Sequence, residues 1–146
     1  MIEAVRSYLA LLRSPPACDR LPALAATLDY LACAYHATSE TAGEDASDPA
    51  DDTTYETMRE LAATTFPDFG FYAVVLPDLN PEQQPMMGDA IDDLADIALE
   101  MARVERLWRD GRTQDAEHHY RFGYRTHWGR HLHDLRGYLH ARQFEG

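Results

Sequence analysis

The stretch that decides the fold is DAIDDLADIALEMARVERLWRDGRTQDAEHHYRFGYRTHWGRHLHDLRGYLHAR, residues 89–142. Its first part, residues 89–110, repeats apolar side chains at helical spacing and ends at Gly111, a residue that suits the left-handed position after a helix. Thr113 can cap a second helix that runs to about Arg142. Because only two or three residues connect them, the two helices are predicted to lie antiparallel, as a long helical hairpin.

Ionisable side chains gather on one side of each of these helices. On the first helix, at 100° per residue, five acids fall within an arc of about 100°. These acids are Asp89, Asp92, Asp93, Asp96 and Glu100. On the second helix, two histidines lie within a broad, mostly aromatic stripe: Tyr120, Tyr124, His127, Trp128, His131, Leu135 and Tyr138. The other four histidines are predicted to face solvent: His118, His119, His133 and His140.

The antiparallel arrangement pairs residues that are equally far from the turn. Asp96 lies sixteen residues before Arg112, and His127 lies fifteen residues after it. The acidic column is therefore expected to meet His127, His131 and Arg130. The candidate functional cluster is Asp92, Asp93, Asp96, His127, Trp128, Arg130, His131 and Asp134.

This cluster has three interpretations. In the first, the cluster is a network of ion pairs and hydrogen bonds that offsets the repulsion among the carboxylates. Alternatively, it binds a divalent metal ion through His127, His131 and Asp96, because two histidines four residues apart on a helix can reach one ion. The sequence lacks the intervening Glu of the metalloprotease motif and the Glu-x-x-His pairs of di-iron bundles. A small-ligand pocket lined by the aromatic side chains is the third interpretation.

The N-terminal half predicts three further helices. Apolar residues at steps of three and four mark a helix that Pro15 and Pro16 end, and a core helix that continues to about Tyr35. Thr53-Thr54-Tyr55-Glu56 resembles a capping box that opens the next helix. The predicted fold class is therefore all-α: one domain over residues 1–146, built as a bundle of about five helices.

Two segments carry no helical pattern. Residues 38–52 hold six acids and no base, which indicates an acidic, flexible loop. Residues 77–87 are predicted to form a Pro-rich linker. Between the helices, residues 69–76 are rich in apolar and β-branched side chains, but the sequence offers no second strand to pair with them. They are expected to form a short helix or an extended segment packed on the core.

Composition narrows the classes of function. The formal net charge is −12, and all 13 basic residues are arginine, so lysine chemistry is excluded and nucleic acid is not an expected partner. No apolar run is long enough to span a membrane, and the first residues do not resemble a signal peptide, so a cytoplasmic location is expected. No G-x-S-x-G or C-x-x-C motif occurs.

Without a complete catalytic motif, the acidic surface favours a non-enzymatic module that binds or regulates another protein through a basic patch on that partner. The alternative is a metal-binding protein or metal-assisted hydrolase that uses the His/Asp cluster between the two C-terminal helices. A homo-oligomer is compatible with either function.

Three segments resemble the recurring motifs of a bacterial family known as domain of unknown function 5063. They are DDLADI at residues 92–97, YRF at residues 120–122 and THWGRHL at residues 126–132. The family pattern F-x-x-H-W-G-x-H-L has its aromatic at Tyr124 or Phe122 here, so the match is close and not literal. The resemblance covers about residues 88–140. It implies a small, mostly helical protein with no established activity.

Overall fold

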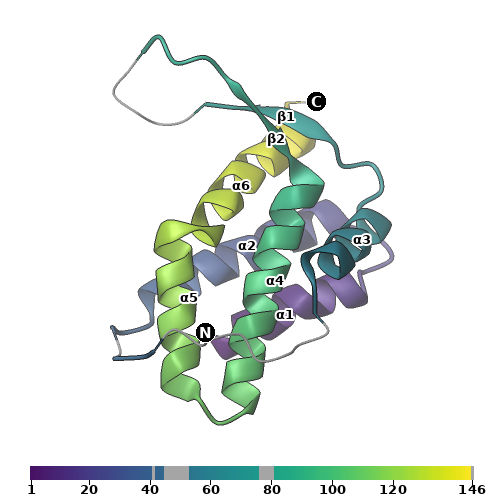
Figure 1. The fold of residues 1–146 in the computed structure, drawn as a ribbon. Helices are drawn as coiled ribbons and strands as arrows, with labels where there is room; N and C mark the ends of the chain where they lie inside the picture. The colour runs from purple at the N-terminus through teal and green to yellow at the C-terminus, as the bar shows by residue number, and fades with distance from the viewer. Residues whose placement is uncertain (41, 45–52, 76–80, 146) are drawn as a thin grey trace.

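The computed structural model describes residues 1–40, 42–44, 53–75 and 81–145 of the chain. It is an all-α fold with a small two-stranded sheet (Figure 1). In chain order the elements are α1 (Ile2–Arg13), α2 (Arg20–His36), α3 (Tyr55–Thr65), β1 (Phe71–Val74), β2 (Met86–Asp89), α4 (Ala90–Arg109), α5 (Thr113–Thr126) and α6 (Trp128–Phe144). The all-α prediction is confirmed, with six helices in the described residues where about five were expected.

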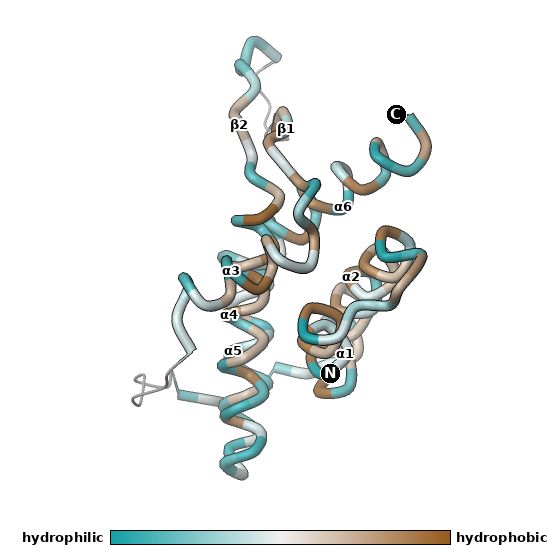
Figure 2. Tube along the Cα trace, turned by 90° about the vertical axis from the view of Figure 1, so that its right-hand side faces the viewer, coloured by the Kyte–Doolittle hydropathy of each residue, from teal (hydrophilic) through white to brown (hydrophobic). Residues whose placement is uncertain are grey.

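Helix α4 is the centre of the bundle, because α1, α3, α5 and α6 all pack against it. Figure 2 shows α1 and α2 side by side, in a layer separate from α4 and α5. Asp89 caps α4: its carboxylate accepts hydrogen bonds from the backbone N–H groups of Ile91 and Asp92. Gly111, with φ of 79°, follows α4 in the left-handed conformation that the sequence predicts for this turn.

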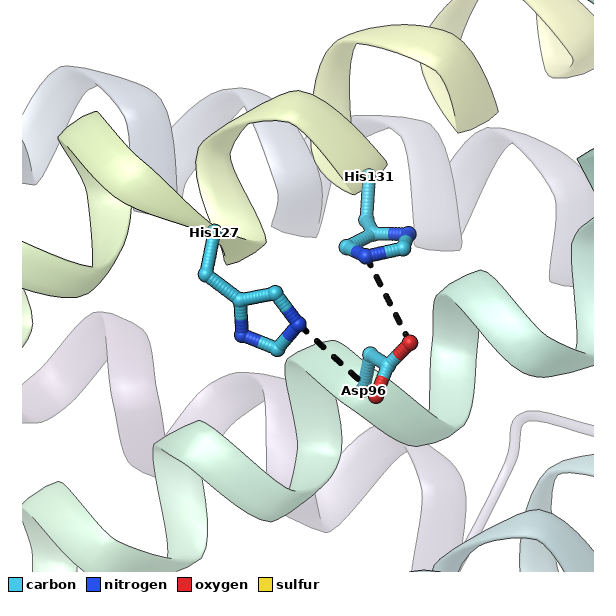
Figure 3. A group of neighbouring side chains, drawn as sticks. All are labelled: Asp96, His127 and His131. Carbon is cyan, nitrogen blue, oxygen red and sulfur yellow. Dashed lines mark ion pairs between the residues drawn. The ribbon is translucent and has the colours of Figure 1, made fainter.

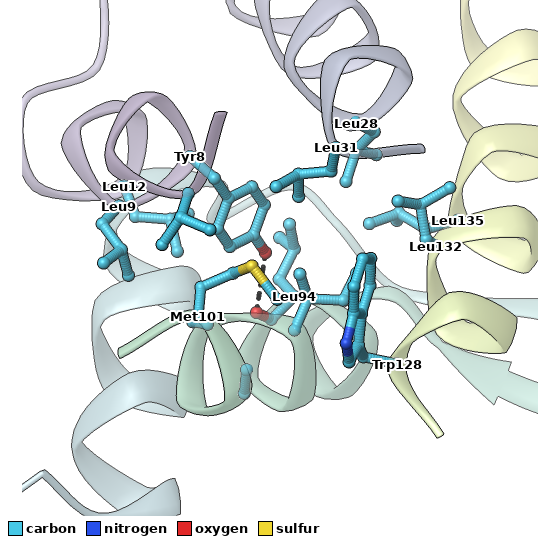
Figure 4. Close-up of a cluster of buried hydrophobic side chains, with 14 of the residues drawn as sticks. Tyr8, Leu9, Leu12, Leu28, Leu31, Leu94, Met101, Trp128, Leu132 and Leu135 are labelled. Carbon is cyan, nitrogen blue, oxygen red and sulfur yellow. Dashed lines mark hydrogen bonds between the residues drawn. The ribbon is translucent and has the colours of Figure 1, made fainter. Parts of the chain in front are cut away.

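The core lies between the α1–α2 layer and α4, and α6 closes it (Figure 4). Leucines of α1 and α2 meet Leu94 and Met101 of α4 and Trp128 of α6, all of them fully buried. Burying one such side chain stabilises the fold by roughly 1.5–3 kcal/mol. The hydroxyl of Tyr8 donates a hydrogen bond to the carbonyl of Leu94 over 2.8 Å, so this phenol is satisfied inside the core.

The second long helix of the predicted hairpin is two helices, so its predicted continuity from Thr113 to Arg142 is wrong. The break falls at His127, whose φ of −146° and ψ of −88° are not helical. After it α6 turns away from α5 (Figure 1). Two glycines allow the close packing at this break. A Cβ at Gly129 would overlap the backbone carbonyl of Tyr124, and one at Gly123 would lie 2.7 Å from the Trp128 ring.

The segment before α4 forms a β-hairpin, so the expectation that no second strand exists is wrong. Strand β1 pairs antiparallel with β2, with Phe71 opposite Asp89 and Val74 opposite Met86. Met86 and Met87, predicted to belong to the linker, are therefore part of a strand. Their sequence, MMGD, contains no β-branched residue, which is why it gave no strand signal.

The predicted acidic loop and linker fall partly outside the described residues, namely at 41, 45–52 and 77–80. Where the loop is described, the backbone N–H of Ser39 donates to Glu117 over 3.1 Å, and that of Glu44 donates to Asp115 over 3.1 Å. Both contacts tie the loop to α5. Across the described chain, none of the helices combines the length and the apolar character that a membrane crossing needs.

Candidate functional site

Two helices and the break between α5 and α6 bring the candidate side chains together. On α4, Asp93, Asp96 and Glu100 are three or four residues apart and share one face. His127 stands at the break, and His131 follows four residues later in the first turns of α6. The two imidazole rings are neighbours, with centroids 5.1 Å apart and planes at 86°.

Both imidazoles direct their Nε2 atoms at the carboxylate of Asp96 (Figure 3). The distance from Nε2 of His127 to one Asp96 oxygen is 3.9 Å. From Nε2 of His131 to the other oxygen it is 3.4 Å. Within this group, one ligand atom from each of the three residues lies within 4.8 Å of the other two. The three residues that the register of the predicted hairpin pairs are thus neighbours in the structure.

The opposite ring nitrogens are held by two more carboxylates of α4. Nδ1 of His131 lies 2.7 Å from Asp93, and Nδ1 of His127 lies 3.3 Å from Glu100. When Nδ1–H donates to a carboxylate, a neutral ring carries its lone pair on Nε2. Both lone pairs then point toward Asp96.

Further hydrogen bonds fix these supporting carboxylates. Asp93 also accepts from the hydroxyl of Tyr72 on β1, and Glu100 lies 2.6 Å from Nε2 of His119 on α5. Asp93 and Glu100 are both buried, at 6% and 8% exposure. Buried carboxylates need such partners, because an unpaired charge away from water is costly. The histidines are therefore supported by buried groups that are themselves held in place.

The ionisation of the cluster reflects burial and these contacts. Burial raises the pKa of Asp96, with His131 opposing and Asp92 adding to this rise. The hydrogen bond with Asp93 raises the pKa of His131, against the opposing effect of burial. For Glu100, burial acts to raise the pKa, but His119 and Arg103 outweigh it and the net pKa is below the ordinary value. Burial and the bond to Asp93 raise the pKa of Tyr72.

The other predicted candidates do not join the histidine–carboxylate group. Asp92 accepts a hydrogen bond from Tyr55 of α3. Arg130 was expected to contact the acids of α4. Its guanidinium instead forms an ion pair with Asp134 on its own helix, over 3.4 Å. Trp128 is fully buried in the core, where it packs on aromatic side chains of α5.

Sequence reasoning missed two supporting residues. His119 was expected to face solvent, whereas it contacts Glu100, and Tyr72 was assigned no role. The signal for His119 is its place eight residues, or about two helical turns, before His127. Nothing in the sequence signals Tyr72, because its contact with Asp93 depends on the unpredicted hairpin.

The fold and site define a small all-α protein with a half-exposed histidine–carboxylate cluster at a helix break. The chain belongs to the family described as Domain of unknown function (DUF5063), whose model matches residues 1–145. Its fold is similar to that in the crystal structure of protein BF1032 from Bacteroides fragilis, with a TM-score of 0.67 and 18% identity over 98% of this chain and 92% of that one. No curated protein matches this chain.

Proposed function

We propose that this protein binds one divalent transition-metal ion through Asp96, His127 and His131. The observation that carries the proposal is the orientation of the two rings. Each Nδ1 lies against a carboxylate of α4, and each Nε2 is aimed at Asp96. Histidines that bind metals are typically held in this way, by a carboxylate behind the ring.

The distances are compatible with a bound ion. Ligands about 2.0–2.2 Å from a tetrahedral zinc ion are separated from one another by roughly 3.3–3.6 Å. The Nε2-to-oxygen distances of 3.4 and 3.9 Å are close to that separation. They are longer than the 2.7 Å between Nδ1 of His131 and Asp93, which is an ordinary hydrogen bond. The two distances run to different oxygens of Asp96, and the three ligand atoms lie within 4.8 Å of one another, so the side chains would have to move closer together to share one ion.

Two imidazoles and one carboxylate suit zinc or ferrous iron, and they leave a coordination position for water or substrate. His127 is the most exposed of the three residues, with 44% of its side chain accessible, so solvent reaches the cluster on that side. Three protein ligands with an open position are typical of catalytic rather than closed structural zinc sites. This feature supports the metal-assisted hydrolase that the sequence offered as its alternative.

Metal titration of untagged protein tests the proposal. Protein stripped with chelator is titrated with Zn²⁺, Mn²⁺ and Co²⁺ by calorimetry, and the Co²⁺ complex is examined by absorption spectroscopy. We expect one ion per chain and loss of binding in Asp96→Asn, His127→Asn and His131→Asn. The control is His140→Asn, since His140 is exposed and lies at the far end of α6.

A protein purified without metal that takes up none on titration would remove the proposal. So would binding that survives all three ligand variants and is lost in the His140 control, because the ion would then sit elsewhere.

The other sequence expectations remain predictions. A protein partner rather than nucleic acid is expected from the acidic composition, and a cytoplasmic location from the lack of a membrane-length apolar run and of a signal-like start. A homo-oligomer is compatible with either function. The metal cluster itself argues neither for nor against them. Gel filtration with light scattering measures the oligomeric state directly, with and without metal.

A further inference from the structure

The β1–β2 hairpin carries an unusual share of the exposed apolar side chains. Of the large hydrophobic residues exposed in the described chain, four lie on the hairpin or directly beside it: Phe71 at 68%, Val75 at 59%, Met86 at 53% and Met87 at 76%. The remaining three are scattered over α2, α5 and the end of α6. Clustered exposed apolar side chains mark interaction surfaces, whereas scattered ones need no explanation.

The strand register explains why one face of the hairpin lacks cover. Side chains alternate along a strand, so Tyr72 and Val74 share one face and Phe71 and Ala73 the other. The first face is turned to the protein: Tyr72 packs on Tyr138 of α6, with ring centroids 5.0 Å apart, and Val74 is buried. The opposite face carries Phe71 and Met87, because Met87 pairs with Ala73. We name Phe71, Ala73 and Met87 the hairpin face.

The hairpin also has open strand edges beside this face. The sheet in the described residues has two strands, so each strand has one edge that no further strand of the sheet covers. Both views place the hairpin at one end of the bundle (Figures 1 and 2). A two-stranded hairpin is marginal alone and gains from a further strand or a covering segment.

The surface next to the hairpin face is acidic. A cleft of about 240 Å³ separates β2 from α4 and α6. The cleft lies behind the protein-facing side chains Tyr72 and Val74, and Met86 and Met87 form its outer wall. Its charged and ionisable side chains are Asp89, Asp92, Asp93, Asp134, Arg130 and the proposed metal ligand His131. Arg59 also pairs with Asp89, but the cleft keeps an excess of negative charge, in keeping with the net charge of −12 for the chain.

We propose that the hairpin is the docking surface for a basic, amphipathic segment of another protein. The apolar side chains of that segment cover Phe71 and Met87, and its lysine or arginine side chains reach into the acidic cleft. Long basic side chains suit this cleft, because their apolar stems can lie on the methionines while the charged ends meet the aspartates.

Charge favours a basic protein segment over a second copy of the chain and over an anionic membrane. A second copy of the chain would bring a second acidic cleft against the first, which is unfavourable. Membranes with anionic headgroups would be repelled by the same carboxylates. A basic protein segment is attracted by them and also satisfies the apolar face.

Peptide binding tests the proposal without knowledge of the natural partner. The probes are two fluorescently labelled twelve-residue peptides with leucine at the same positions and either lysine or glutamate at the others. Anisotropy is measured against the full chain, once in chelator and once with added Zn²⁺, so that the result does not depend on the metal proposal. We expect the lysine peptide to bind at least tenfold tighter than the glutamate peptide, and its affinity to fall as salt rises.

Variants locate the binding surface. Phe71→Asp and Met87→Asp are each expected to weaken the lysine peptide at least fivefold, and the pair at least tenfold. The control is Phe122→Asp, a change of the same chemistry at an exposed aromatic of α5. Circular dichroism melting confirms that all the variants are folded. Because Phe71 and Met87 are solvent-exposed, their replacement leaves the core intact.

Four outcomes of the binding measurements would overturn the proposal. They are equal affinity for both peptides, failure of the lysine peptide to bind, unchanged binding in the Phe71/Met87 double variant, and binding to phosphatidylserine vesicles that exceeds binding to the peptide. Sedimentation of the wild type as a dimer that Phe71→Asp converts to a monomer would also overturn it, because a second copy would then cover the hairpin face.

Discussion

The two histidines of α6 that lie two residues apart, His131 and His133, differ in their surroundings. His131 is bonded to the buried Asp93, and its side chain is 26% exposed. His133 is exposed and contacts the hydroxyl of Tyr124 over 2.9 Å. We expect His131→Ala to lower the free energy of unfolding of the metal-free protein by more than about 1 kcal/mol, because a buried carboxylate loses a partner.

The matched change His133→Ala is expected to stay within about 0.5 kcal/mol of wild type. Urea unfolding at one pH, in chelator, measures both variants. Equal losses would show that the bond to Asp93 contributes no more than an exposed contact does.

Glu100 provides a second residue-scale prediction, which rests on the proposed metal site. Glu100→Gln keeps the shape of the side chain but weakens the acceptor behind His127. Loss of such a supporting carboxylate costs about 10–100-fold in metal affinity, and we expect a loss in that range for Zn²⁺ by calorimetry. The control is Glu105→Gln on the same helix, since Glu105 pairs with arginines away from the cluster. An unchanged affinity for Glu100→Gln would mean that this carboxylate does not orient the ring.

The sequence predicted the central residues of the cluster because periodicity and register are local rules. His127 and His131 were identified by their spacing of four, and Asp96 by its distance from the Gly111 turn. His119 was missed because the helical wheel placed it off the aromatic stripe. The wheel assumed one straight helix through His127, whereas α5 ends there and has its own orientation against α4.

The break between α5 and α6 is the element-scale feature that shapes the site, and it depends on Gly129. A Cβ at this position would overlap the backbone carbonyl of Tyr124, which cannot rotate away as a side chain could. We therefore expect Gly129→Ala to destabilise the protein by about 1–3 kcal/mol, as overpacking does. It should also weaken metal binding, because His127 stands at the break and His131 lies two residues after Gly129.

Gly137 is the matched control on the same helix. A Cβ at Gly137 would meet no atom within 4 Å. Gly137→Ala is expected to stabilise α6 by roughly 0.5–1 kcal/mol, the usual gain for alanine over glycine in a helix. Thermal and urea unfolding measure both changes. A neutral Gly129→Ala variant would mean that α5 and α6 can separate at no cost, and the steric account of the break would be wrong.

Elements with strong periodicity were predictable, and those set by tertiary contacts were not. Helices α1 to α4 follow apolar spacing, caps and prolines. The break at His127 has no such signal, because the aromatic stripe continues through it from Tyr120 to Tyr138. The strand β2 has none either, since MMGD lacks β-branched residues and pairs with β1, which packs on α6 through Tyr72 and Tyr138.

At the scale of the whole molecule, the cluster joins elements that are distant in sequence. Asp96 belongs to the central helix, His127 stands at the break opposite it, and His131 lies in the first turn of α6. Through Asp93 the group extends to Tyr72 of the hairpin, and the neighbouring Asp92 reaches Tyr55 of α3. An ion bound at this point would link the α5–α6 break to α4. The contact of Asp93 with Tyr72 would connect the ion site to the hairpin.

Metal binding should therefore stabilise the protein in a pattern that follows this connectivity. Any ligand that binds only the folded state adds about 2.7 kcal/mol when its free concentration is 100 times the Kd. Beyond this global gain, we expect amide exchange to slow most around residues 124–131 and at β1, and least in α1 and α2, which do not touch the cluster. Hydrogen-exchange mass spectrometry in chelator and in Zn²⁺ measures the difference, and Asp96→Asn should abolish it. Protection that instead centres on the exposed His140 would place the ion at the far end of α6, and the half-exposed cluster would then be an ion-pair network.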